Sequence, residues 1–255
     1  MRVRAFAVAA TMCAAAWSVH AAPDPGKPAE PRMEFVPPPA GTYDLQRIQL
    51  SPDAALLDPA SRLQRLATHT TGKITLLTFF YTYCVDPWGC PFAYWTLVGL
   101  RDRVLAEPQL AKRVRFVNVS FDPTNDTPEA LGRYGARFMN DPRFEWRFLT
   151  ARSVPDLLPV LEGFGQDVTV AHDANGRPTR TINHMLKMFL IDHGGTVREI
   201  YSLAYLQQQV MLNDIKTLAL EEHAAVAAAH LTGAAADTEA RRIAVRAAAD
   251  SAIAH

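Results

Sequence analysis

The stretch GKITLLTFFYTYCVDPWGCP, residues 72–91, decides the fold of this chain. Its first part, Ile74 to Tyr83, is a short apolar run rich in β-branched and aromatic residues, which predicts a strand buried on both faces. The run ends at Cys84, and a loop that contains proline and glycine leads on to Cys90. Two thiols are therefore expected where a central strand passes into a helix.

A helix is predicted directly after the second thiol. Pro91 suits a first helical position because that position needs no N–H donor, and apolar residues recur at helical spacing from Ala93 to Ala106. The unpaired N–H groups of the first turn would stabilise a thiolate on Cys90. A second apolar strand, Val114 to Phe121, completes a βαβ unit whose two strands are expected to be parallel.

The next segments continue the α/β pattern. Thr127 is a plausible helix cap ahead of Pro128, and the helix should run to about Met139. Trp146 to Leu149 is expected to be a short strand and Val154 to Phe164 another helix.

The second half of the chain has the sequence pattern of β-strands. Between Asp167 and Tyr201, the dipeptide Asn175-Gly176 predicts a hairpin turn, and the strands of this region should be antiparallel additions to the sheet. Residues 205–222 should form a closing helix. Before the first strong strand, Ile48 to Leu50 is expected as a short strand and Pro52 to Leu66 as short helical turns.

Length, charge and cysteine usage limit the function. The 255 residues carry a formal net charge of +0, which argues against nucleic-acid binding. Residues 1–21 combine two arginines with an Ala-rich apolar run and small residues at the end, the pattern of a secretory signal peptide. Cys13 should leave with it, so that the mature chain keeps only Cys84 and Cys90 in a periplasmic or otherwise exported compartment where disulfides persist.

Three further divisions of the chain are expected. Residues 22–42 are a Pro-rich linker, residues 43–222 the folded domain, and residues 223–255 an Ala-rich tail. No second apolar run is long enough to cross a membrane, so no transmembrane anchor is expected after signal cleavage.

Together these patterns predict a thioredoxin-like α/β fold with a central mixed sheet, flanking helices and β-hairpin additions. The sequence also resembles the Sco (SenC) family of copper chaperones for cytochrome c oxidase across roughly Tyr43 to Glu222. The resemblance lies in GKITLLTFFYTYC, VSFDPTNDTPEALGRYGARF, WRFLTA and INHMLKMFLIDHGGTVREIYS. It implies a copper ion bound by Cys84, Cys90 and His184, and a copper-receiving respiratory protein, such as a cytochrome c oxidase subunit, as partner.

One departure from the family pattern concerns the loop. The family places three residues between its cysteines, whereas VDPWG gives five between Cys84 and Cys90, which indicates a divergent subgroup. Met185 and Met188 follow His184 closely. Thioethers suit Cu(I), but in a strand these two side chains would face opposite ways, so both cannot easily join one site.

Other functions fit the same residues. Cys84 and Cys90 could form a structural disulfide, or cycle between dithiol and disulfide as a thiol-disulfide oxidoreductase acting on a thiol client. Without the resemblance, His184 would be read as a hydrogen-bonded bystander. A peroxidase would need one activated thiol beside an Arg and a Thr, and the sequence shows no such arrangement. Copper handling is the favoured hypothesis and thiol redox chemistry the alternative.

Overall fold

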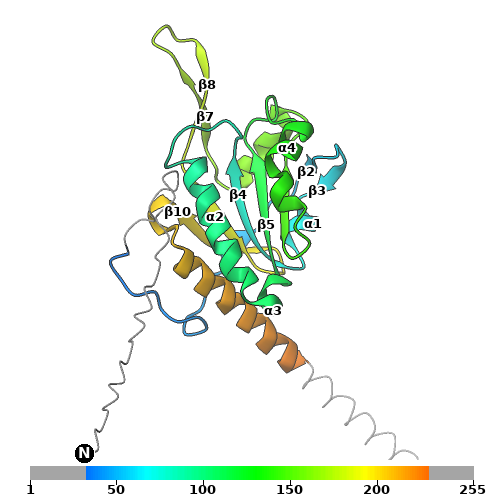
Figure 1. Cartoon of the computed structure of the whole chain (residues 1–255), viewed down its shortest axis with the longest axis vertical. Coiled ribbons are helices and arrows are strands. Elements are labelled where there is room, and N and C mark those ends of the chain that lie inside the picture. Colours follow the sequence, from blue (N-terminus) through cyan, green and yellow to red (C-terminus); the bar gives the residue numbers. More distant parts are fainter. Residues whose placement is uncertain (1–32, 230–255) are drawn as a thin grey trace, which may run out of the picture.

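The structure, a computed structural model, describes residues 33–229 (Figure 1). The predicted signal peptide and residues 230–255 of the predicted tail lie outside this range, as does most of the predicted linker. The elements are β1 (Gln49–Leu50), β2 (Ala55–Leu57), β3 (Leu63–Arg65), α1 (Ala67–Thr70), β4 (Ile74–Phe80), α2 (Cys90–Leu105), α3 (Pro108–Ala111), β5 (Val114–Ser120), α4 (Pro128–Met139), β6 (Glu145–Leu149), α5 (Val154–Gly163), β7 (Val168–His172), β8 (Pro178–His184), β9 (Lys187–Ile191), β10 (Thr196–Ser202) and the 3-10 helix η1 (Leu203–Tyr205). A closing helix covers residues 208–229, so it extends from the predicted segment into the predicted tail.

Strand β4 lies in the interior of a 6-stranded mixed sheet with the order β1-β10-β9-β4-β5-β6. It pairs in parallel with β5, from Ile74 beside Val114 to Phe80 beside Ser120. On its other side it pairs antiparallel with β9. All 7 residues of β4 and all 7 of β5 are buried, as expected for apolar strands covered on both faces. The predicted central, parallel strand pair is confirmed.

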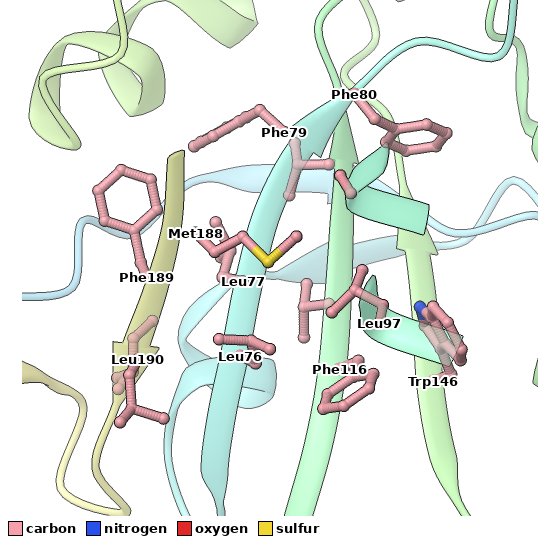
Figure 2. Close-up of a cluster of buried hydrophobic side chains, with 14 of the residues drawn as sticks. Leu76, Leu77, Phe79, Phe80, Leu97, Phe116, Trp146, Met188, Phe189 and Leu190 are labelled. Atoms are coloured by element: carbon pink, nitrogen blue, oxygen red, sulfur yellow. The ribbon is translucent and has the colours of Figure 1, made fainter. Parts of the chain in front are cut away.

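Aromatic side chains of β4 pack against helical segments on both faces of the sheet. The Phe79 ring contacts Phe164, directly after α5, with centroids 5.6 Å apart. The Phe80 ring contacts Tyr134 of α4 with centroids 5.4 Å apart. Because successive side chains of a strand point to opposite faces, α4 and the end of α5 cover opposite sides of the sheet. Figure 2 shows the core between these layers, where side chains of β4, β5, β9 and α2 meet.

The start of α4 follows the predicted capping pattern. The Thr127 hydroxyl accepts a hydrogen bond from the Ala130 N–H at 3.3 Å, and Pro128 occupies the first turn. This arrangement satisfies one of the N–H groups that a helix start leaves unpaired. The predicted bounds of α4 and its cap are confirmed.

The prediction of helical turns between Pro52 and Leu66 is wrong. This segment forms a small antiparallel hairpin of β2 and β3, in which Leu56 pairs with Gln64. Leu56 is fully buried, and the Leu57 N–H donates to the Thr150 carbonyl at 2.6 Å. The physical reason is non-local: a partner distant in sequence and a burial site for Leu56 override the local helical preference.

The region from Asp167 to Tyr201 contains the predicted hairpin at Asn175-Gly176 and a second hairpin, but only the second joins the main sheet. Strands β9 and β10 extend it as predicted, whereas β7 and β8 form a separate 2-stranded sheet. Figure 1 shows that this hairpin projects from the end of the molecule where β4 passes into α2. Most of its residues are exposed, and only a few apolar side chains, Val168 and Ile182 among them, pack against the core.

The closing helix is tied to the sheet by a buried carboxylate. Asp214 accepts hydrogen bonds from the hydroxyls of Tyr43, at 2.5 Å, and Tyr201, at 2.7 Å. Within residues 33–229, no helix combines the length and the apolar character needed to cross a bilayer.

Candidate metal centre

The loop between β4 and α2 folds back so that its two cysteines approach each other. The Asp86 carboxylate accepts a hydrogen bond from the Trp88 N–H at 3.0 Å, and the Gly89 N–H donates to the Asp86 carbonyl at 3.0 Å. These bonds close a tight turn inside the five-residue spacer. A Cβ added to Gly89 would lie 3.3 Å from Cys84 Sγ, so the first sulfur sits against the residue that precedes Cys90.

Both cysteines are free thiols, but they differ in exposure. Cys84 is partly exposed, whereas Cys90, the first residue of α2, is 5% exposed. A ligand approaching from solvent therefore reaches Cys84 more easily than Cys90.

The pair carries one thiolate and one thiol. A hydrogen bond from the Cys90 thiol is the largest influence on the pKa of Cys84. Together with the Cys90 backbone N–H and the Tyr81 hydroxyl, this bond outweighs the effect of burial and lowers the pKa of Cys84 to about 5. The same hydrogen bond to Cys84, followed by burial, raises the pKa of Cys90. The backbone N–H at the helix start does lower the pKa of Cys90, in the predicted direction, but the hydrogen bond to Cys84 and burial outweigh it.

His184, the last residue of β8, is oriented by its surroundings. Its ring lies 4.5 Å from the Phe121 ring and 6.1 Å from the Tyr81 ring, measured between centroids. Nδ1 is 3.1 Å from the Ile182 carbonyl oxygen, which can only accept a hydrogen bond. With the proton on Nδ1, the lone pair of the neutral imidazole is on Nε2.

That second nitrogen of His184 has no partner. Nε2 is buried and makes no hydrogen bond. Buried polar atoms in native proteins nearly always have a partner, so an unpaired imidazole nitrogen is a candidate metal ligand.

Cys84 and His184 line the same cavity, which has a volume of about 350 Å³. Tyr81, Trp88 and Met185 also line it. Cys90 instead lines a second cavity of about 320 Å³, into which Cys84 also opens. Cys84 and its neighbour Tyr81 thus line both cavities.

The three predicted ligands are brought to one end of the sheet without forming a closed site. Among residues 33–229, no three His, Cys, Asp or Glu side chains lie close enough together to hold a metal ion. The donor types nevertheless fit a soft cation: Cys84 supplies a thiolate and His184 an unpaired nitrogen, with Cys90 adjacent to the first sulfur.

Two supporting residues were not expected from the sequence. The Tyr81 hydroxyl is one of the groups that lower the pKa of Cys84, although the sequence indicated only a core residue. Asp126, expected to shape a turn or cap a helix, accepts hydrogen bonds from the Thr82 hydroxyl at 2.5 Å and the Thr82 N–H at 3.1 Å. Neither partner could be identified from local patterns, because each bond depends on where the loop after β4 lies.

The fold and the paired thiols at the end of the central strand define a thioredoxin-like α/β protein with a candidate soft-metal site. The family model described as SCO1/SenC matches residues 59–220, and the chain belongs to this family. No curated protein shows significant similarity to the chain.

Solved structures share the fold. Arabidopsis thaliana ScoI with copper bound is 18% identical, and the match covers 68% of this chain and 99% of that one with a TM-score of 0.56. Apo Sco1 from Thermus thermophilus is 25% identical over 70% of this chain and 95% of its own, also with a TM-score of 0.56. BsSco, described as a member of the Sco family of cytochrome c oxidase assembly proteins with a disulfide switch, is 20% identical over 69% and 98%, with a TM-score of 0.52.

Proposed function

We propose that this protein is an exported copper chaperone that binds Cu(I) through Cys84, Cys90 and His184. Its client would be a respiratory copper protein such as a cytochrome c oxidase subunit. The observation that carries the proposal is the buried, unpartnered Nε2 of His184 in the cavity that Cys84 lines. Family membership and the copper-bound and oxidase-assembly relatives support it.

The donor set suits copper as cargo. Thiolates favour Cu(I), and an imidazole keeps Cu(II) tolerable, so the site would accept either oxidation state. A site of three ligands that is open on one side allows a partner's ligands to replace its own, which transfer requires. His184 lies on the projecting hairpin, and its movement toward the cysteine loop would complete the set.

A Cu(I) titration tests the proposal. Reduced protein is titrated against a chromophoric Cu(I) chelator, and wild type should bind one Cu(I). Cys84→Ala, Cys90→Ala and His184→Ala should each lose most of this affinity, because solvent alone would replace the missing ligand. His172→Ala is the matched control, since His172 is exposed on the same hairpin. Wild-type affinity in His184→Ala would contradict the three-ligand site.

The free thiol pair also supports a second candidate, thiol-disulfide exchange. The Cys84 thiolate would attack a client disulfide and displace one client thiolate, and the Cys90 sulfur, after losing its proton to water, would release the second. The client gains the two electrons that the pair loses on forming its own disulfide. If His184→Ala binds copper as wild type does and only the cysteine variants lose reductase activity, this function replaces the first.

Export remains part of the proposal. It is supported by the signal-peptide pattern of residues 1–21. The intact mass of the protein recovered from the exported fraction should lack this segment, whereas an unprocessed protein confined to the cytoplasm would contradict it.

A further inference from the structure

The two methionines beside His184 occupy opposite environments. Met188 lies on β9 and is fully buried, opposite Thr78 of β4. Figure 2 shows its side chain among the apolar residues of the core. Met185 lies between β8 and β9, is 64% exposed, and lines the cavity of Cys84 and His184. The thioether of Met188 serves packing, whereas Met185 is at the candidate site.

The backbone of Met185 is anchored at this position. The Gln166 amide donates a hydrogen bond to the Met185 carbonyl at 3.0 Å, and Gln166 is 3% exposed. The neighbouring Lys187 ammonium donates to the Gly165 carbonyl at 2.6 Å. These contacts hold the β8–β9 connection against the segment after α5, so Met185 stays at the cavity while its side chain remains exposed.

The cavity therefore contains a different donor set from the one that the three-ligand site uses. Cys84, His184 and Met185 line it together, and Cys90 does not. A thiolate, an imidazole nitrogen and a thioether are all ligands that Cu(I) accepts, and a neutral thioether is the weakest of the three and the easiest to displace.

We propose that Met185 is an entry ligand for Cu(I). The inference rests on the proposed function and adds a step to it. Cu(I) that enters this cavity is first held by the Cys84 thiolate, Nε2 of His184 and the Met185 thioether. The Cys90 sulfur then replaces the thioether: the Cys90 proton passes to water, Met185 leaves as a neutral thioether, and copper stays Cu(I). Release to a client reverses the sequence.

The test follows the methionine methyl groups directly. Reduced protein carrying ¹³C-labelled methionine methyls is titrated with Cu(I) and examined by NMR, using Cys90→Ser to stop the sequence at the entry complex. The Met185 methyl should shift on addition of one equivalent, while the methyls of fully buried Met188 and Met211 stay in place. X-ray absorption of the same complex should show two sulfurs and one nitrogen, and one sulfur fewer when Met185→Leu is added.

Uptake kinetics supply a second readout. In the wild-type background, Met185→Leu should slow Cu(I) uptake by about tenfold while the final affinity changes much less, because the completed site does not contain the thioether. Because Met185 is exposed, its replacement by leucine should not impair folding, and circular dichroism checks this. Met139→Leu, at the end of α4 and outside the cavity, is the matched control.

The outcomes separate this inference from the function on which it rests. If wild type binds one Cu(I) through its cysteines and His184 but the Met185 methyl does not shift in Cys90→Ser, the entry ligand is refuted and the chaperone stands. If wild type binds no Cu(I), the proposed function fails and the entry ligand with it.

Discussion

Cys84 and His184 line one cavity although they are positioned by two separate sheets. Cys84 follows β4 in the interior of the 6-stranded sheet, whereas His184 ends β8 of the 2-stranded hairpin. The core fixes the position of the loop that carries the sulfur. The position of the imidazole depends instead on how the hairpin lies against the domain.

This arrangement predicts a contrast in hydrogen exchange. Amides of β7 and β8 should exchange faster than those of β4 and β5, because the hairpin is largely exposed and the central strands are fully buried. Addition of Cu(I) should slow exchange around residues 178–184, since a shared metal would tie the hairpin to the cysteine loop. Mass spectrometry of peptides measures both effects. Equal exchange in hairpin and central strands, or no effect of copper, would contradict the prediction.

Asp126 is expected to hold the cysteine loop in position. Its carboxylate accepts hydrogen bonds from Thr82 and, at 2.6 Å, from the Ser120 hydroxyl, and it is fully buried. Asp126→Ala should lower the free energy of unfolding by about 1–3 kcal/mol, because buried donors lose their acceptor. Cu(I) affinity should also fall, by about tenfold. Urea denaturation and chelator competition measure the two effects.

The matched control for Asp126 is Glu129→Ala. Glu129 is exposed and pairs only with Arg133 on the same helix face, so its removal should change both quantities little. An Asp126→Ala protein that is destabilised but binds copper as wild type does would show that the carboxylate serves the fold and not the loop.

Two glycines of α4 should respond oppositely to alanine. A Cβ on Gly135 would lie 2.6 Å from the Phe148 ring, whereas a Cβ on Gly132 would meet only Pro59 at 3.6 Å. Gly132→Ala should therefore gain about 0.5–1 kcal/mol of stability from helix propensity. Gly135→Ala should lose about 1–3 kcal/mol through overpacking. Thermal and urea unfolding check the signs, and stabilisation by both changes would contradict the close packing of α4 on β6.

The parts of the fold that the sequence predicted are those with local signals. An uninterrupted apolar run predicts β4, and a Thr-Pro pair followed by an acid predicts the start of α4. The β2–β3 hairpin had no such signal, since Leu56 is placed by partners distant in sequence. The separate position of β7 and β8 had no local signal either, because an Asn-Gly turn predicts a hairpin but not the sheet that the hairpin joins.

The candidate site shows the same division. The sequence and the family resemblance indicated Cys84, Cys90 and His184. In the structure, Cys84 lines one cavity together with Cys90 and another together with His184. The sequence could not show which sulfur carries the charge, because this depends on the hydrogen bonds that Cys84 receives in the folded loop. Nor could the sequence show which of Met185 and Met188 lies at the site and which lies in the core, because this depends on where β9 begins.

The final prediction concerns the charge on Cys84. In reduced, metal-free protein, the rate of alkylation of Cys84 by iodoacetamide should rise with pH around a midpoint of about 5, because a depressed pKa means that the thiolate is present above that pH and lost below it. Cys90 should react slowly at neutral pH, since its pKa is raised and it is buried. Cys90→Ala should move the Cys84 midpoint up strongly, because the hydrogen bond from Cys90 is the largest cause of the shift, and Tyr81→Phe should move it up less. Peptide mass spectrometry after timed alkylation assigns each rate to its cysteine. A Cys84 midpoint near the ordinary thiol value, about 8.5, would mean that the folded loop does not stabilise the thiolate and that either sulfur could be first to meet a metal or a disulfide.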